Sequence, residues 1–598
     1  MSYMGSVLRV DLSTGSITTE KVSKDLASGF IGGRGLATKM FTDEVDATVD
    51  PLSPANKLLF ATGPLTNTTA PTGGRYMVVT KSPLTGLIAS SNSGGYFGAR
   101  MKKAGYDAII FEGKSPEPVY LVLNEETAEL KSAAALWGKR VWDVTDTLIA
   151  EYGQKNASVA CIGPAGENLS LIASVMNDKH RAAGRSGVGA VMGSKNLKAI
   201  IAWGSKKSPI VDEAKMREFV KQKVQMLKEN GVTGQGLPAL GTKVLDNIIN
   251  ESGIYPTRNF NESVFDGVDK MSGEALVDKY LVKNSACYAC PIGCGRVVEL
   301  PSGLKGEGPE YESGWAFGPM CGIDDLNAIT EANLICNDLG LDTISAGVTI
   351  SAAMELFEKG FIPGDDLGKG PSLKFGTTEA LAWYLKKMAY REDVGDAMAL
   401  GSYRLCEKYG HPEFSMTVKK QELPAYDPRG VQGHGLAYAT SNRGGCHVRA
   451  YLISPEIVGL PEKLDPQEIT GKPAWVKIFQ DLTAVIDSAG LCLFSSFALG
   501  AQDYADLLNA ALGNSWSADD VLQIGERIWN LEREFNLNAG TDPATDTLPA
   551  RLLKDPVTAG PNKGSVHRLA ELLPEYYALR GWDVKGVPTK EKLKELGL

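Results

Sequence analysis

The chain has 598 residues, of which 43% are hydrophobic and 22% are charged, and its formal net charge is −9. This length is too great for one ordinary core and predicts roughly three to four domains. The negative charge argues against nucleic acid as the main partner, because phosphate binding favours a basic face.

The apolar segments argue against a membrane span. No uncharged stretch reaches the ~20 residues that a membrane helix needs, and the most apolar window, 484–501, contains Asp487. The first residues show no basic start followed by an apolar run, so a secretion signal is not predicted. We therefore expect a cytoplasmic protein whose nine cysteines are reduced.

Short β-prone runs dominate the first 210 residues and alternate with turn residues, which predicts a β-rich domain at 1–210. The predicted strands are 7–12, 57–62, 76–80, 108–112, 119–123 and 199–203. Glycines cluster around 29–35, 73–98 and 184–193, where the backbone can approach another group closely.

Helical periodicity dominates after residue 210. Asp212 is predicted to be the N-cap of a helix that runs to about Asn230. Further helices are predicted at 325–338, 344–359, 378–390 and 519–534. The fold class is therefore α+β, with a β-rich N-terminal domain followed by two mainly α-helical domains at 211–415 and 416–598; the family resemblance described below implies a cofactor between them.

Four of the nine cysteines carry the clearest chemical signal. Cys287, Cys290 and Cys294 lie within Cys-Tyr-Ala-Cys-Pro-Ile-Gly-Cys, whereas Cys492 is remote. This spacing lets one loop direct three sulfurs at a [4Fe–4S] cluster, which a remote fourth thiolate completes. Zinc more often takes two spaced pairs of cysteines, and unligated thiols are the other alternative. The spacing favours a protein that moves electrons.

Two segments that lie 150 residues apart, 337–342 and 487–492, share the pattern polar-x-x-Gly-Leu-polar. Each places a glycine where a helix can end and offers polar side chains beside it. Two ordinary helix ends are the alternative. Because Cys492 belongs to the second segment, a cluster ligand would lie beside Asp487, which is how a cluster is placed against a second cofactor.

Together these residues resemble the tungsten-dependent aldehyde:ferredoxin oxidoreductase family, over essentially the whole chain. The resemblance depends on several blocks in a fixed order, each of which is weak alone. The blocks are Gly-Gly-Arg-Gly at 32–35, Ala-Pro-Thr-Gly-Gly-Arg at 70–75, Ser-Asn-Ser-Gly-Gly-Tyr-Phe-Gly at 91–98, His-Arg-Ala-Ala-Gly-Arg at 180–185, Val-Met-Gly-Ser-Lys-Asn-Leu-Lys-Ala-Ile at 191–200, the four cysteines, Gly-Pro-Glu-Tyr-Glu at 308–312, Asp-Pro-Arg-Gly at 427–430 and Ala-Thr-Ser-Asn-Arg-Gly-Gly-Cys-His at 439–447.

The resemblance implies a tungsten ion held by two pterin dithiolenes, so that cofactor sulfurs rather than protein side chains ligate the metal. Tungsten fits this soft sulfur environment, and molybdenum has similar demands. The chain has only five histidines and no His-x-x-x-His pair. The resemblance also implies one [4Fe–4S] cluster on the four cysteines and a Mg²⁺ ion that bridges the pterin phosphates.

By the resemblance, the glycine-rich blocks bind the pterin phosphates through backbone N–H groups and guanidinium groups. Arg75 and Arg185 are the expected phosphate contacts, and the carbonyls of Asn92 and Ala182 are the expected magnesium ligands. The other expected cofactor contacts in these blocks are Ser93, Gly94, Gly95, Arg181 and Gly184. Tight turns and surface arginines are the alternative.

The two acidic loops are expected to hold the pterin rings, because carboxylates accept hydrogen bonds from ring N–H groups. Asp342 and Asp487 match the family pattern, and Leu491 packs the second loop. The first loop departs from the pattern, because it opens with Asn337 followed by Asp338. Which of these two residues faces the pterin is left open by the sequence.

The resemblance also implies that Glu312 and His447 are catalytic residues beside the metal. His447 would polarise the aldehyde carbonyl, and Glu312 would take a proton from water or from the hydrated aldehyde. Glu310 competes with Glu312 for this role, and Arg449 can add positive charge near the same pocket. A solvated glutamate and a core histidine are the alternatives.

The expected reaction is therefore oxidation of an aldehyde to a carboxylic acid, with ferredoxin or a dedicated iron–sulfur subunit as electron acceptor. One alternative is a low-potential reductase such as an aromatic acyl-CoA reductase, and another is an iron–sulfur electron-transfer subunit without tungsten. An oligomer is expected. The Glu-x-x-His iron site that some relatives have between subunits is not, because 331–334 reads Glu-Ala-Asn-Leu.

Overall fold

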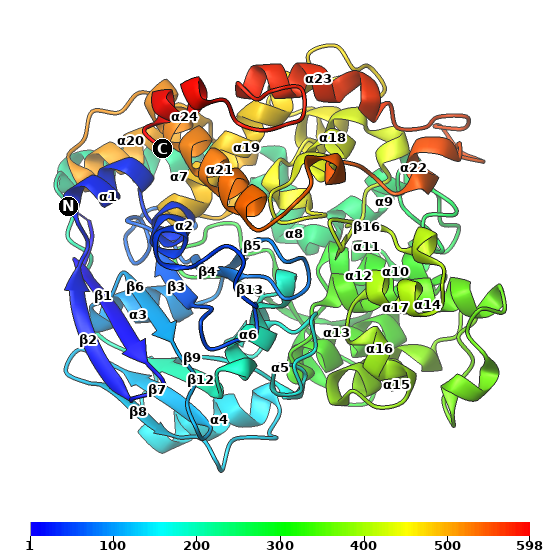
Figure 1. The fold of residues 1–598 in the computed structure, drawn as a ribbon, viewed down its shortest axis with the longest axis horizontal. Coiled ribbons are helices and arrows are strands. Elements are labelled where there is room, and N and C mark those ends of the chain that lie inside the picture. The colour runs from blue at the N-terminus through cyan, green and yellow to red at the C-terminus, as the bar shows by residue number, and fades with distance from the viewer. Residues whose placement is uncertain (1) are drawn as a thin grey trace.

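The computed structural model describes residues 2–598, and two six-stranded sheets form its N-terminal part (Figure 1). The first sheet, in spatial order, consists of β2 (Ser16–Lys21), β1 (Ser6–Asp11), β6 (Ala108–Glu112), β3 (Leu58–Thr62), β4 (Tyr76–Lys81) and β5 (Ile88–Ser93). The second consists of β11 (Arg181–Ala183), β10 (Val175–Asn177), β9 (Ser158–Cys161), β12 (Leu197–Ala202), β7 (Val119–Leu123) and β8 (Ala128–Ser132).

Helices separate and cover these two sheets. One core joins apolar side chains of both sheets to α3 (Phe97–Ala104) and α6 (Val188–Ser194). The opposite face of the first sheet packs on α2 (Gly33–Glu44), and that of the second packs on α4 (Val141–Tyr152). Because both faces of β3 and β4 are buried, these strands are almost continuously apolar rather than alternating.

The rest of the chain is mainly helical, apart from a three-stranded sheet and a short hairpin. The sheet consists of β13 (Leu281–Ser285), β14 (Gly295–Glu299) and β15 (Lys305–Glu307), and the hairpin of β16 (Thr417–Val418) and β17 (Gln421–Glu422). The longer helices are α7 (Glu213–Glu229), α13 (Leu326–Leu339), α14 (Thr343–Glu358), α15 (Glu379–Tyr390), α18 (Gln432–Thr440), α19 (Lys472–Ala489), α20 (Ala501–Leu512), α21 (Ala518–Asn538) and α23 (Leu569–Arg580).

In Figure 1, α12 (Tyr311–Phe317) to α17 (Ser402–Lys408) lie beside the sheets on one flank, whereas α19 to α24 (Lys590–Leu596) lie above them. The largest core combines side chains of α13 and α14 with side chains of α18, so it extends across residue 415. A second core joins α1 (Lys24–Phe30) to α19, α20 and α21. The division into domains at 210 and 415 stays a prediction.

The predicted α+β class is confirmed, and the predicted strands and helices are present within a few residues of their expected bounds. Asp212 caps α7 by accepting a hydrogen bond from the Lys215 N–H group. The sequence patterns did not predict β2, β5, β8 to β11 or β13 to β17. Among these, β13 to β15 are short segments that carry exposed polar residues and lack the alternation typical of strands. Within residues 2–598, no helix combines the length and the apolar character needed to cross a bilayer.

Candidate functional site

The two polar-x-x-Gly-Leu-polar segments adopt the same backbone geometry at the ends of α13 and α19. Gly340 and Gly490 have φ values of 77° and 84°, in the left-handed region that favours glycine. The N–H groups of Gly340 and Leu341 both donate to the Cys336 carbonyl oxygen. Leu491 likewise donates to the carbonyl oxygen of the residue five positions before it. The predicted helix ends are confirmed.

Each sheet brings one glycine against one of these helix ends. A Cβ atom on Gly63, directly after β3, would lie 2.1 Å from the carbonyl carbon of Ala489. A Cβ atom on Gly163, after β9, would lie 2.3 Å from the carbonyl oxygen of Leu339. Only glycine permits this approach, so each sheet is packed directly against one acidic loop.

The aspartates of the two loops are buried and hydrogen-bonded. Asp342 caps α14 by accepting from the N–H groups of Ile344 and Ser345, and its Oδ2 lies 3.2 Å from Arg185 Nε. Asp487 accepts hydrogen bonds from Asn92 Nδ2 at 3.0 Å and from an Arg449 guanidinium nitrogen at 2.5 Å. Because each carboxylate faces a guanidinium group, its charge is balanced although it is buried.

The predicted cluster cysteines are gathered around Arg75. Cys287, Cys290 and Cys294 lie on the loop that joins β13 to β14, and Arg75 Nη2 donates to Cys492 Sγ at 2.9 Å. Burial raises the pKa of Cys290, and the charges of Cys492 and Cys287 raise it further, which indicates that these thiols lie close together. Within residues 2–598, no three His, Cys, Asp or Glu side chains converge closely enough to hold a single metal ion.

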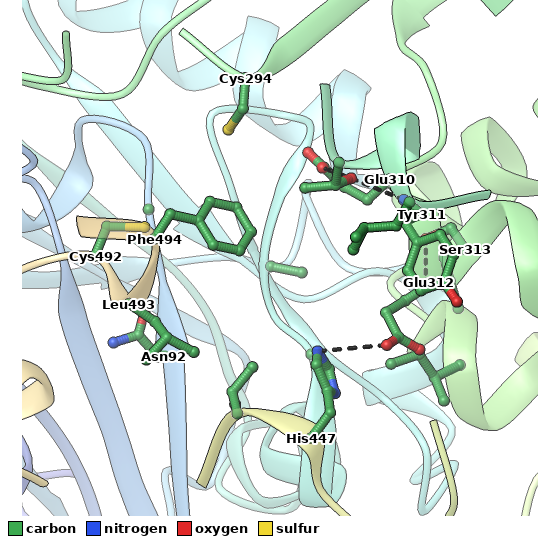
Figure 2. A pocket seen from close by; sticks show the side chains of 18 of the residues that line it. Asn92, Cys294, Glu310, Tyr311, Glu312, Ser313, His447, Cys492, Leu493 and Phe494 are labelled. Carbon is green, nitrogen blue, oxygen red and sulfur yellow. Dashed lines mark hydrogen bonds and ion pairs between the residues drawn. The ribbon is translucent and has the colours of Figure 1, made fainter. Parts of the chain in front are cut away.

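A cavity of about 500 Å³ lies between the sheets and the helices. Cys492, Cys294, Glu312 and His447 all contribute to its wall, and Figure 2 shows the Phe494 ring between Cys492 and the carboxylates of Glu310 and Glu312. An apolar part of the wall is formed by Val232, Leu237, Val244, Leu245, Ile248, Val458, Leu493 and Phe497. The cavity thus has a polar side between the acidic loops and an apolar side toward the helices.

Glu312 and His447 face each other across this cavity (Figure 2). Glu312 lies in the first turn of α12, and His447 follows the loop after α18. Glu312 Oε1 lies 3.6 Å from His447 Nε2, and Glu312 Oε2 accepts a hydrogen bond from the Ala425 N–H group at 3.0 Å. Neither Glu312 Oε1 nor His447 Nδ1 has a hydrogen-bond partner among the described residues.

Burial makes both groups favour their neutral forms. It raises the pKa of Glu312 to about 8, although the Ala425 N–H group opposes the shift. Burial, together with the nearby charge of Arg185, lowers the pKa of His447 well below its usual range. At neutral pH the 3.6 Å contact therefore joins a largely protonated carboxyl group to a neutral imidazole. An acid–base group with a pKa near neutrality is suited to proton transfer.

Most of the predicted cofactor contacts line the cavity. Arg185, whose guanidinium donates to the carbonyl oxygens of Gly445 and Glu422, is one of them. Arg181 is another, and its Nη2 lies 2.7 Å from Glu307 Oε2. The remaining lining residues of the predicted set are Arg75, Asn92, Gly94, Ala182, Gly184, Asn337, Asp342 and Asp487.

The other predicted cofactor contacts lie behind the wall. Asp338 points away, because its carboxylate accepts from the Trp142 N–H group and pairs with Arg140 at 3.1 Å. It is Asn337 that reaches the cavity.

Ser93 and Gly95 also support the wall from behind. The Ser93 hydroxyl donates to Asn177 Oδ1, and the Gly95 carbonyl accepts from the Tyr288 N–H group. Leu491 is buried in the core that α19 shares with α20, and Arg449 reaches the site through its hydrogen bond to Asp487. Direct contact of these residues with a cofactor stays a prediction.

Several residues of the site were not singled out from the sequence. Tyr426 and Tyr451 line the cavity, and their hydroxyl groups lie 2.7 Å apart. Arg443 also lines it and donates to Cys446 Sγ at 2.9 Å. In the sequence, only their positions in or beside the family blocks could have indicated them. Tyr426 precedes the Asp-Pro-Arg-Gly block, and Arg443 lies in the block that ends at His447.

Arg34 is a further missed residue. Its fully buried guanidinium forms two hydrogen bonds with Glu532, at 2.7 and 2.6 Å, and its Nη1 lies 3.5 Å from Asp487 Oδ2. The two partners are 498 residues apart, so no local pattern connects them. Arg34 adds a second positive charge behind the Asp487 loop.

Comparisons with known proteins agree with this geometry. Residues 7–204 match the model of the N-terminal domain of aldehyde ferredoxin oxidoreductase, and residues 218–598 match the model of its domains 2 and 3. The chain is 59% identical to the tungsten-containing aldehyde ferredoxin oxidoreductase of Pyrococcus furiosus, over 99% of this chain and 98% of that protein. The protein of the same description from Thermococcus kodakarensis is 57% identical, with the same coverage.

Among solved structures, the active site complex BamBC of benzoyl coenzyme A reductase, in complex with 1,5-dienoyl-CoA, superposes with a TM-score of 0.88. Its sequence identity to this chain is 26%, and the match covers 100% of this chain and 97% of that one. Both family models and the identity over almost the full length indicate the same family. The chain belongs to the aldehyde ferredoxin oxidoreductase family.

Proposed function

We propose that this protein oxidises aldehydes, with water, to carboxylic acids at a bis-pterin tungsten centre. Electrons leave through a [4Fe–4S] cluster on Cys287, Cys290, Cys294 and Cys492. The observation that carries the proposal is the cavity in which Glu312 and His447, 3.6 Å apart, face two acidic loops and two of the cysteines. The high identity to tungsten-containing relatives supports the choice of metal and substrate class.

The chain's own groups fit such a cofactor. The guanidinium groups of Arg75, which is half-buried, and of Arg185, which is buried, can bind the pterin phosphates, together with Mg²⁺ on the carbonyls of Asn92 and Ala182. The side chains of Asp342 and Asp487 can accept hydrogen bonds from the pterin rings. A metal ligated by cofactor sulfur needs no protein ligands of its own; in the part of the chain that the structure describes, no three His, Cys, Asp or Glu side chains converge on a metal-ion position.

The acid–base residues account for the proton part of the reaction. An aldehyde and water give a carboxylic acid, two protons and two electrons. Glu312 Oε1, which has no other partner, can accept the proton of the attacking water, and neutral His447 can donate a hydrogen bond to the aldehyde oxygen. When bound, the tungsten cofactor supplies a two-electron acceptor, and the cluster supplies a route for single electrons.

A second candidate is a low-potential reductase, because the superposed BamBC structure belongs to a benzoyl coenzyme A reductase. Sequence identity favours the aldehyde oxidase, at 59% against 26%. An iron–sulfur electron-transfer subunit without tungsten is less favoured, because the acid–base pair and the pterin-sized cavity would then have no use.

We infer further that the electron acceptor is a ferredoxin or an iron–sulfur subunit, as the names of the relatives imply. We also infer a cytoplasmic oligomer that lacks the intersubunit iron site, because Leu334 stands where a histidine would be needed. Leu334 is 1% exposed and packs within the fold, so it offers no ligand at the surface.

The test is an anaerobic purification followed by elemental analysis and a viologen assay. Tungsten, iron and pterin should co-purify, and viologen should be reduced only when an aldehyde is added. Short, long and aromatic aldehydes then define the substrate range. Iron without tungsten or molybdenum would support the electron-transfer subunit, and viologen-dependent reduction of an aromatic acyl-CoA without aldehyde turnover would support the reductase.

A further inference from the structure

Three cations and two tyrosines form a surface directly outside the cysteine loop, which we call the basic–aromatic surface: Tyr96, Arg100, Lys103, Lys206 and Tyr288. Tyr96, which is 42% exposed, precedes α3. The Tyr96 and Tyr288 rings are 6.4 Å apart and perpendicular, at 88°. Arg100 lies over the Tyr96 ring at 6.0 Å, and Lys103 lies over the Tyr288 ring at 5.8 Å.

This surface is joined to the predicted cluster ligands through short contacts. Tyr288 follows Cys287 in the chain, and its N–H group donates to the Gly95 carbonyl oxygen at 3.1 Å. On the adjacent residue, a Cβ atom on Gly94 would lie 2.9 Å from Cys287 Sγ. Ala289, in the same loop, is exposed. A protein that docks here is therefore separated from the cysteine sulfurs only by this short stretch of main chain.

Lys206 belongs to the same surface, because its backbone N–H group donates to the Lys103 carbonyl oxygen at 3.2 Å. The Lys206 carbonyl oxygen accepts from Asn67 Nδ2, and Asn67 Oδ1 accepts from the Tyr288 hydroxyl at 3.4 Å. The segment after β12 is thus fixed beside α3 and the cysteine loop. Arg100 and Lys103 both lie in α3, so these contacts hold the backbone of Lys206 beside the helix that carries the other two cations.

The cations of this surface lack counter-charges. Among residues 2–598, no carboxylate oxygen lies within 4.0 Å of the side-chain nitrogens of Arg100, Lys103 or Lys206. Burial lowers the pKa of Lys103, and the neighbouring charge of Arg100 lowers it further. Glu125 lies near enough for the charge of Lys206 to contribute to its lowered pKa, but its carboxylate bonds the Ser205 N–H group. On a chain of net charge −9, this is a positive region whose three cations form no ion pair with any described residue.

We propose that the basic–aromatic surface is the docking site for an acidic iron–sulfur electron acceptor. The proposal rests on the proposed function, since the docked acceptor takes its electrons from the protein's own reduced cluster. Each acceptor cluster takes one electron as the protein's own cluster is reoxidised, so two such transfers follow each aldehyde oxidised. Charge complementarity fits the partner, because a carboxylate-rich protein supplies the missing counter-charges and steered association is fast. The tyrosines supply the apolar contact area that interface centres use.

The experiment compares two matched triple charge reversals in the holoenzyme. The test variant is Arg100→Glu, Lys103→Glu and Lys206→Glu. The control variant is Lys369→Glu, Lys374→Glu and Lys386→Glu, which alters exposed lysines before and within α15. Figure 1 shows α3 and α15 well apart. Each protein is assayed with aldehyde and benzyl viologen, and with aldehyde and an acidic bacterial-type [4Fe–4S] ferredoxin. The Kd of the oxidised ferredoxin is measured separately.

The test variant should keep its viologen rate, because a small dye does not need the surface. Its kcat/KM for ferredoxin should fall about 10–100-fold at low ionic strength, and its Kd should rise in parallel. The difference from the control should shrink as salt is added, because exposed charges are screened. The milder pair Lys103→Gln and Lys206→Gln should show a loss of the same sign if the triple variant does not fold.

Ferredoxin reduction and Kd equal to those of the control would overturn the docking site. A protein that reduces no viologen with any aldehyde would instead overturn the proposed function, and the Kd comparison would still report on the surface. The two failures are therefore distinguishable.

Discussion

At the residue scale, the site depends on two acid–base groups whose protonation is set by burial. Glu312 has one oxygen held by the Ala425 N–H group and the other unpaired, which directs a single basic position into the cavity. His447 stays neutral because burial and the charge of Arg185 disfavour its cation. A neutral imidazole can donate one hydrogen bond to a substrate oxygen without repelling the nearby guanidinium groups.

The pH dependence of turnover follows from this arrangement. Burial raises the pKa of Glu312 to about 8, so the carboxylate that we propose accepts a proton is the minor form below that pH. kcat/KM for an aldehyde should therefore rise roughly tenfold per pH unit below about 8 and level off above it. A viologen assay across this range measures the profile. A rate that falls as pH rises through 8 would show that Glu312 acts as an acid.

At the element scale, the two helix ends and the glycines packed on them fix the aspartates. Gly63 and Gly163 allow each sheet to lie so close to a helix end that the helix end occupies the space where a Cβ atom would be. Sequence could anticipate the helix ends, because Gly340 and Gly490 are local signals. It could not choose between Asn337 and Asp338, since that choice is set by the distant residues Arg140 and Trp142.

Substituting Gly63 by alanine should move the end of α19. The added Cβ atom would lie 2.1 Å from the carbonyl carbon of Ala489, so the helix end and Asp487 must shift. We expect a loss of stability of about 1–3 kcal/mol and less pterin per chain. Thermal unfolding and pterin analysis measure both. Gly29→Ala is the control, because nothing lies within 4 Å of its Cβ position in α1. Equal pterin content in the two variants would contradict the argument.

At the scale of the whole molecule, the cavity is closed only by the sheets and both groups of helices together. Arg34 of the first sheet's covering helix contacts Glu532 of α21, and Arg185, two residues after β11 of the second sheet, contacts Asp342, the N-cap of α14. The two residues of each pair are far apart in the chain. Local sequence patterns could therefore predict the fold class but not all of the residues that line the cavity. The cysteines could be predicted as cluster ligands from spacing, whereas Tyr426 and Arg443 required the assembled structure.

Because residues from all of these parts line the cavity, removal of the proposed cofactor should weaken the whole assembly. Protein produced without tungstate should unfold several degrees below the metal-loaded protein, since a ligand that binds only the folded state stabilises it. It should also be cut more readily at 204–211, the largely exposed connection between β12 and α7. Differential scanning calorimetry and limited proteolysis compare the two preparations. Identical unfolding temperatures would show that the cavity is stable without its cofactor.

The most direct test of the account is turnover by Glu312→Gln, measured with the metal content of the same sample. Glutamine keeps the size of the side chain but cannot accept the proton, so tungsten and iron should be retained while aldehyde-dependent viologen reduction falls about 10²–10⁴-fold. Glu310→Gln is the control and should keep most activity, because the Glu310 side chain is 43% exposed and bonds Thr242. Normal turnover by a fully metal-loaded Glu312→Gln variant would contradict the account.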